Sequence, residues 1–246
     1  MSRVRPILFN TDMVRAILDG RKTVTRRVAK KIPVETHRIE VNLRPETFKG
    51  IEVKEFECHW GGYQPDTGSF VDGCCIMKPP CQPGDILYIR ETWFYEMHLH
   101  DKVPGEPDLP SGRYSHRYVY KADFPDYPVG IGVGANGWHP SIHMPKEAAR
   151  IWLKVTDVRV ERLWDIRDLR AEGIHTSESC DECFAVCGGC DPDNSPVGCD
   201  NEIEKFSELW DSTIKKADLD RYGWDANPWV WVIEFERCER PEGWPT

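Results

Sequence analysis

The sequence predicts a mixed α+β fold, a small barrel with flanking short helices, rather than a parallel sheet with crossover helices. Short β-prone segments with alternating apolar residues are interleaved with three short helices, one of them clearly amphipathic. The regular alternation of strand and helix that marks a parallel sheet is missing. The 246 residues, 40% hydrophobic and 30% charged, suit one small domain enlarged by long insertions.

The first predicted elements are a short helix and a strand with one polar face. Thr11 is a candidate N-cap for a helix over about 12–19, and Gly20 is placed to end it in a left-handed turn. The segment 21–28 is rich in β-branched residues and predicts a strand. Its alternate positions form the polar face: Arg21, Thr23, Thr25 and Arg27.

The middle of the chain predicts two long insertions around a buried strand. Residues 32–82 mix Pro, Gly and Cys with short alternating pieces, which indicates a peripheral insertion that carries a hairpin. The turn residues at 83–85 lead into a buried strand over 86–90. Residues 97–145 lack periodicity and predict long loops, with one strand near 117–120.

The last third predicts a strand, two helices and a closing strand. Residues 151–160 alternate as a strand does, and Asp165 can cap a short helix that reaches Glu172. An amphipathic helix over 201–216 and a β-prone strand over 229–235 follow. The helix carries one apolar stripe: Ile203, Phe206, Leu209, Trp210 and Ile214.

Charge is distributed unevenly along the chain. The formal net charge is −9, yet residues 1–31 carry nine Lys and Arg against two Asp. The segment 172–220 has thirteen acidic residues against three Lys, which makes it a candidate surface for a protein partner. Because a local patch sets the field that a ligand meets, the acidic total does not exclude a nucleic-acid partner. We expect a cytoplasmic protein with no membrane segment, since no run of about 18 apolar residues and no signal-peptide core is present.

The basic segment 20–27 is the first candidate site. It holds four cations and two hydroxyls where the predicted helix ends and the strand begins. Arg and Lys supply phosphate contacts, and a Lys beside a Thr forms a base and nucleophile pair when its surroundings lower the Lys pKa. The alternative is a solvated basic edge that protects an edge strand from aggregation.

Four segments, in order, resemble ASCH domains (activating signal cointegrator homology), especially the long phage-encoded members. Residues 6–27, ending in Gly-Arg-Lys-Thr-Val-Thr-Arg-Arg, are similar to the opening motif of the family. Pro83 to Tyr88 resembles its Gly-Asp strand entry, and Ala171-Glu172-Gly173 its acidic helix end. The closing helix and strand are matched by Phe206 to Trp210 and Trp229 to Phe235. The remaining segments lie outside the shared core: 32–82, 97–145 and 177–200.

The resemblance implies a single PUA-like β-barrel over 1–246, with a cleft for RNA or a modified nucleoside. Some small bacterial ASCH proteins are amidohydrolases that remove the acetyl group of N4-acetylcytidine with a Lys, a Thr three residues later and a Glu near a helix end. The matching positions are Lys22, Thr25 and Glu172, although Gly173 replaces a bulkier residue of the small enzymes. Thr25 would attack the amide carbonyl, Lys22 would carry the proton, and Glu172 would hold Lys22 or the substrate amine.

Ten cysteines without an export signal indicate thiols or metal ligands. Two Cys-x2-Cys pairs separated by three residues are typical of Zn2+ ligands, and an iron–sulfur cluster is the alternative. The predicted structural Zn2+ ligands are Cys180, Cys183, Cys187 and Cys190. A second, less regular group in the first insertion could form another site: Cys58, His59, Cys74, Cys75 and Cys81.

Further candidates for substrate contact lie near turns and at strand ends. Aromatic side chains stack on bases in single-stranded nucleic-acid binders. Trp93 and Trp224, next to turns and polar residues, are the better candidates for this role. Periodic apolar faces predict packing roles for Trp152, Trp210 and Trp231. The full set of predicted nucleic-acid or substrate contacts is Arg21, Arg26, Arg27, Glu91, Trp93, Trp224 and Asn227.

Three functions remain open from the sequence. The first is recognition of RNA or a modified nucleoside, and the second is hydrolysis of an acylated cytidine without a catalytic cofactor. The third is a phage protein-interaction module that uses the acidic, metal-clipped insertion. Fold alone does not choose among them.

Overall fold

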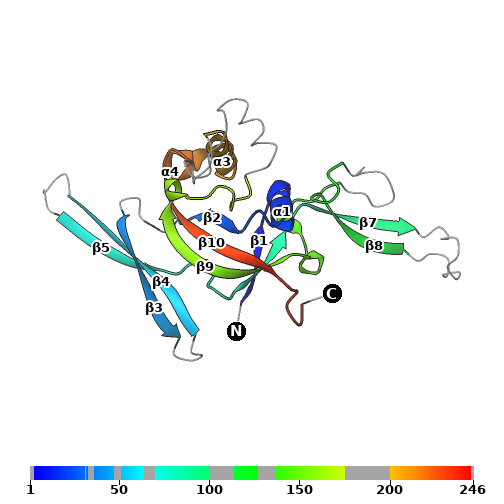
Figure 1. Cartoon of the computed structure of the whole chain (residues 1–246), viewed down its shortest axis with the longest axis horizontal. Helices are drawn as coiled ribbons and strands as arrows, with labels where there is room; N and C mark the ends of the chain where they lie inside the picture. Colours follow the sequence, from blue (N-terminus) through cyan, green and yellow to red (C-terminus); the bar gives the residue numbers. More distant parts are fainter. Residues whose placement is uncertain are drawn as a thin grey trace. The chain divides into compact units, whose positions relative to one another are not determined.

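The computed structural model describes residues 3–30, 32, 36–46, 51–63, 70–99, 114–126, 137–174 and 200–244, and its fold is mixed α+β with mostly sheet structure (Figure 1). The chain divides into two compact units. The main segments of the first unit are Arg21–Asp85 and Lys154–Glu236. The second unit consists of Arg3–Gly20, Ile86–Leu153 and Arg237–Thr246.

The sheet of the first unit places the basic segment at its edge. Strand β10 (Trp229–Cys238) lies between β9 (Trp152–Arg162) and β2 (Val24–Val28) (Figure 1). β2 runs antiparallel to β10, with Thr25 opposite Ile233. The strand predicted over 21–28 therefore begins only at Val24. The polar face expected at its alternate positions is not uniformly exposed, because Thr25 is buried.

The segment after β9 corrects a prediction. A helix from Asp165 to Glu172 was expected, but the structure has a 3-10 turn at Leu163–Asp165 and then turns and bends. The Asp165 carboxylate accepts from the amide of Arg162 and so caps the 3-10 turn, not the predicted helix. Asp168 accepts from the amides of Arg170 and Ala171, which fixes a tight turn in place of helical hydrogen bonds.

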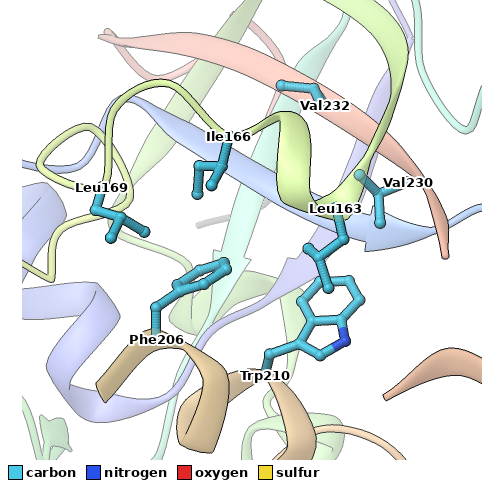
Figure 2. Packing of buried hydrophobic residues seen from close by; sticks show 7 residues of the cluster. All are labelled: Leu163, Ile166, Leu169, Phe206, Trp210, Val230 and Val232. Carbon is cyan, nitrogen blue, oxygen red and sulfur yellow. The ribbon is translucent and has the colours of Figure 1, made fainter. Parts of the chain in front are cut away.

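The hydrophobic core of the first unit lies between this segment, β10 and helix α3 (Asp200–Ser212). Figure 2 shows Phe206 and Trp210 of α3 directed toward Leu163 and Ile166 of the turn segment. The amphipathic helix thus ends at Ser212 rather than near 216, and its predicted packing role is confirmed. A short 3-10 turn (Lys216–Asp218) and helix α4 (Leu219–Tyr222) follow it.

The first insertion is an antiparallel meander of three strands, consistent with the hairpin expected there. It consists of β3 (Thr36–Glu46), β4 (Ile51–Tyr63) and β5 (Phe70–Met77). It is not wholly peripheral, because Phe56 is fully buried and its ring meets that of Trp231 edge-on, 5.0 Å between centroids. Trp231 therefore packs as predicted.

The second unit begins with strand β1 (Val4–Leu8), which pairs in parallel with β6 (Ile86–Arg90). Helix α1 (Thr11–Leu18) follows β1, but its N-cap is Asn10 and not Thr11, because the Asn10 side chain accepts from the amide of Met13. Gly20 has φ 75°, the left-handed conformation expected after the helix.

A second ribbon lies where long loops were expected. Strands β7 (Trp93–Leu99) and β8 (Tyr114–Tyr120) form an antiparallel pair, so β8 is longer than the predicted strand and β7 was missed. Two 3-10 turns, Ser141–His143 and Lys146–Ala148, complete the unit. Within the described ranges, no helix has the length and apolar character needed to cross a membrane.

Candidate functional site

The centre of the candidate site is a buried group of three charged side chains in the first unit. Lys22 Nζ lies 2.7 Å from Glu172 Oε2, and Arg26 Nη1 lies 2.5 Å from Glu172 Oε1. Lys22 and Glu172 are each 3% exposed and Arg26 6%. Removing three charges from water is costly unless they pair, so this one carboxylate offsets the burial of two cations.

Backbone hydrogen bonds bring these residues together from distant parts of the sequence. The amides of Thr23 and Val24 both donate to the carbonyl of Ala171, and Lys22 and Glu172 form an isolated antiparallel bridge. Lys22 Nζ also donates to the Glu172 carbonyl at 2.9 Å. The turn segment therefore runs beside the start of β2, and its last residues make turn hydrogen bonds, such as Glu172 amide to Leu169 carbonyl, in place of an α-helix.

Two neighbouring residues fix this junction. Gly173 has φ 80°, a conformation that favours glycine, so it lets the chain turn immediately after Glu172. Arg21 Nη1 donates to the Gly173 carbonyl at 3.1 Å. Arg21 was a predicted substrate contact, and the structure shows it bound to the backbone of the junction.

Burial changes the acidity of the cations. It lowers the pKa of Lys22 below its usual 10.5, a shift that the nearby Glu172 carboxylate opposes and that Arg27 and Arg26 reinforce. Burial likewise lowers the pKa of Arg27. A lysine with a lowered pKa in a buried cluster is a common feature of functional sites.

Arg26 is the member of the cluster that lines a cavity. Besides Glu172 it pairs with Glu161 of β9, Nη2 to Oε2 3.5 Å. Its Nε is buried without a hydrogen-bond partner. Because an unsatisfied buried donor costs free energy, this nitrogen adds to the cost of burying the cluster.

A cavity of about 300 Å³ opens beside Arg26. Its polar lining contains three arginines and three carboxylates together with two threonine hydroxyls, so both donors and acceptors border a space without net formal charge. Its polar residues are Thr23, Arg26, Thr156, Arg159, Glu161, Arg167, Asp168 and Glu234. Such a lining fits a neutral ligand with many hydrogen-bonding groups, such as a nucleoside.

One wall of this cavity is an ordered ion-pair network. Arg159 pairs with Glu161 on its own strand and with Glu234 on β10. Because Glu161 also pairs with Arg26, the network joins both strands to the Lys22 cluster. These side chains hold one another in place and present their remaining hydrogen-bonding positions to the cavity.

Thr25, the predicted nucleophile, is buried at 2% exposure next to β10. Arg27, another predicted contact, is partly buried opposite Trp231. From the basic motif, Thr23, Val24 and Arg26 line the cavity described above. A ligand in this cavity would therefore meet Arg26 and Thr23 of the motif.

Trp224 and Asn227, which the sequence placed near a cleft, make structural contacts. The Trp224 ring meets Phe206 edge-on at 5.9 Å and packs on the core cluster. Asn227 has φ 43°, and its side-chain oxygen accepts from the amide of Trp164 at 2.8 Å. Asn tolerates this left-handed conformation better than most residues, which accounts for its position before β10.

Glu91 and Trp93 belong to the second unit. Glu91 is 1% exposed and receives both donors of a forked pair from Arg150, at 2.9 and 3.1 Å. Burial raises the pKa of Glu91, while Arg150 opposes the shift. The Trp93 ring contacts His139 at 4.8 Å and Tyr118 at 5.7 Å between centroids, so its faces are partly occupied.

The predicted Zn2+ ligands Cys180, Cys183, Cys187 and Cys190 lie outside the described residues. Among the residues that the structure does describe, no group of three or more His, Cys, Asp or Glu is arranged to hold a metal ion. The strand register places Cys58 opposite Cys75 and His59 opposite Cys74. Cys81 is buried.

Comparison of the chain with known proteins found no matching family model, no similar curated protein and no similar solved structure.

Several residues of the cavity were not singled out by the sequence. Arg159, Glu161 and Glu234 come from two strands whose alternation predicts only packing, and their pairing depends on the register of β9 against β10. Arg167 and Asp168 were assigned to a helix that does not form. The visible signal was the concentration of charged residues at positions 157–172, without any motif to mark it.

Proposed function

We propose that this protein is an ASCH-type module with a PUA-like fold that binds RNA or a modified nucleoside in the cavity beside Arg26. The observation that carries the proposal is the Arg26 guanidinium. Its side chain is 4% exposed, its ion pairs with Glu172 and Glu161 hold it in place, and the residue lines a cavity about 300 Å³ in volume. Preorganised donors of this kind lower the cost of ordering a bound ligand.

The lining of the cavity favours a base or nucleoside over a phosphate as its occupant. The amide and carbonyl groups of a base need both donors and acceptors, and the cavity supplies guanidinium, carboxylate and hydroxyl groups. The three arginines of the lining are offset by three carboxylates, so the cavity offers a phosphate no net electrostatic attraction. The cavity volume lies at the small end of ligand sites, which suits one nucleoside.

A specific observation supports hydrolysis of an N4-acylated cytidine as the second candidate. Lys22, whose pKa is lowered by burial, is held 2.7 Å from Glu172, and Thr25 lies three residues along the same segment. In this mechanism the uncharged Lys22 amine takes the Thr25 proton as Thr25 Oγ attacks the amide carbonyl. Lys22 then returns the proton to the N4 leaving group, which departs as cytidine.

The acetyl group would then remain on Thr25 as an ester. A water molecule would attack it while Lys22 takes the water proton and passes it to the departing Thr25 Oγ, which releases acetate and restores the hydroxyl. Glu172 would orient the Lys22 amine through both of its contacts. We place this candidate second because Lys22, Thr25 and Glu172 are each no more than 3% exposed. Binding beside Arg26 needs no movement of these three residues.

Calorimetric titration with N4-acetylcytidine, cytidine and a short single-stranded RNA tests the proposal. Arg167 lines the cavity and is exposed, whereas Arg170, also exposed, is not part of the lining. We expect Arg167→Ala to weaken binding by about tenfold, the loss of one charge-assisted hydrogen bond, and Arg170→Ala to leave it unchanged. Equal affinities for wild type and both variants, or no binding of any of these ligands, would contradict the proposal.

The same ligand separates binding from hydrolysis. Incubation of wild type and Lys22→Met with N4-acetylcytidine, followed by chromatography for cytidine, reports turnover. Release by wild type that is lost in a folded Lys22→Met variant assigns the amidohydrolase reaction. Binding without release by wild type leaves recognition as the function.

A further inference from the structure

Arg26 also contributes to the lining of a second cavity. This cavity has a volume of about 350 Å³ and is bounded by the end of β2, the residues after α3 and helix α4. Four of its lining residues are cations and one is an acid: Arg26, Arg27, Lys30, Lys215 and Asp218. Unlike the first cavity, it therefore has a marked formal positive charge.

Aromatic side chains contribute part of its surface. Trp210 is buried, and its indole nitrogen donates to the carbonyl of Tyr222 at 2.8 Å, which fixes α4 against the end of α3. The ammonium of Lys30 lies over the Tyr222 ring at 5.9 Å from its centroid. This cation–π contact keeps Lys30 at the cavity while its charge stays available to an anion.

The position of Lys215 distinguishes ligand binding from stabilisation of the preceding helix. A lysine just after a helix stabilises the negative end of the helix dipole, and Lys215 and Lys216 are equivalent in that respect. Both are exposed and both follow α3 (Asp200–Ser212), yet Lys215 alone of the two lines the cavity. Comparing the two lysines therefore separates ligand contact from helix stabilisation.

Arg26 connects the two cavities. It contributes to the lining of both, is anchored by Glu172 and Glu161, and retains an unpartnered Nε. One cavity is balanced in charge and suits a nucleoside, and the other is cationic and suits phosphate. Because Arg26 lines both cavities, a nucleotide with its base in one and its phosphate in the other would pass beside this residue.

We propose that the cavity of Arg26, Arg27, Lys30 and Lys215 binds the phosphate of a nucleotide, either a free mononucleotide or one within an RNA strand. This inference rests on the proposed function and extends it, because it assigns separate places to the nucleoside and to its phosphate. Lys30 and Lys215 act as phosphate-binding residues at the rim, and Arg26 bridges to the nucleoside cavity.

Titration of the full chain with cytidine 5′-monophosphate, inorganic phosphate, cytidine and a short single-stranded RNA provides the test. We expect Lys30→Ala and Lys215→Ala each to weaken binding of the monophosphate by about tenfold and to leave cytidine unaffected. The matched control Lys216→Ala keeps wild-type affinity. Because Lys30 and Lys215 are exposed, both variants are expected to fold, and thermal unfolding checks this.

The arms of the experiment identify the source of the phosphate. Loss of RNA affinity in the two variants, with a smaller dependence on salt, assigns the phosphate to an RNA strand. Loss confined to the monophosphate assigns a free nucleotide. Unchanged affinity for both in folded Lys30→Ala and Lys215→Ala, or equal weakening by Lys216→Ala, overturns the inference.

Failure of this inference is distinguishable from failure of the proposed function. If Arg167→Ala weakens nucleoside binding while the lysine variants leave phosphate binding intact, the nucleoside site stands and the phosphate site does not. If nucleosides do not bind wild type but the lysine variants weaken monophosphate binding, the phosphate site stands alone.

Discussion

Replacing Glu172 with glutamine is the substitution that most directly tests the buried cluster. It keeps the shape of the side chain but removes the one charge that pairs with both Lys22 and Arg26, at 2.7 and 2.5 Å. All three side chains are at most 4% exposed, so water cannot replace the lost partner without local opening. Removing one member of a buried ion pair costs about 3–5 kcal/mol, and we expect Glu172→Gln to fall in that range.

An exposed ion pair in the same unit supplies the matched control. Glu236 lies 3.5 Å from Lys154, and both side chains are more than half exposed, 59% and 54%. Glu236→Gln should therefore cost less than about 1 kcal/mol. Urea unfolding of wild type and both variants gives the free energies. If Glu172→Gln were no more destabilising than Glu236→Gln, the buried cluster would not contribute as the geometry indicates.

Three further predictions concern acidity, core packing and backbone conformation. Burial lowers the pKa of Lys22, so the folded protein binds fewer protons at this residue than the unfolded chain as the pH approaches 10.5 from below. The unfolding free energy of wild type relative to Lys22→Met should therefore rise with pH in that window. Urea titration at several pH values measures this difference. Phe206→Ala, at a site 4% exposed, should cost about 3–5 kcal/mol by urea unfolding, and a cost below 1 kcal/mol would contradict the packing in Figure 2. Asn227→Ala should lower stability by about 1–3 kcal/mol, because alanine fits φ 43° poorly and loses the contact with Trp164. Asn227→Gly should cost less in the same thermal-unfolding series.

Local patterns in the sequence were sufficient for the regular elements. The apolar stripe of α3, the β-branched run of β10 and the turn before β6 each identify an element from a few neighbouring residues. The bounds differ by a few positions, because the ends depend on contacts such as the Asn10 cap of α1 or the bridge between Lys22 and Glu172.

The turn segment after β9 shows why a local pattern can mislead. Asp165, Ile166 and Leu169 have the spacing of a capped helix, but Ile166 and Leu169 are instead buried against α3 and β10. The Ala171 carbonyl accepts from two amides at the start of β2, so tertiary hydrogen bonds replace helical ones. That competition involves residues about 150 positions apart, which a short window does not contain.

The candidate site was predicted in part for the same reason. The basic motif and the resemblance to ASCH domains drew attention to Lys22, Arg26 and Glu172, and the structure brings these three together. The other residues of the cavity walls depend on the register of β9 against β10 and on the turn after α3, so no sequence motif marked them. The Zn2+ site of the cysteine-rich segment and the protein partner of the acidic region remain predictions.

Mapping where a nucleoside binds tests the central claim most directly. Chemical shifts of the isotope-labelled protein, recorded during titration with N4-acetylcytidine, report which backbone amides meet the ligand. We predict saturable shifts at Thr23, Ala171 and Phe235, which line the cavity beside Arg26. An absence of shifts, or shifts confined to the β7–β8 ribbon around Trp93, would contradict the account.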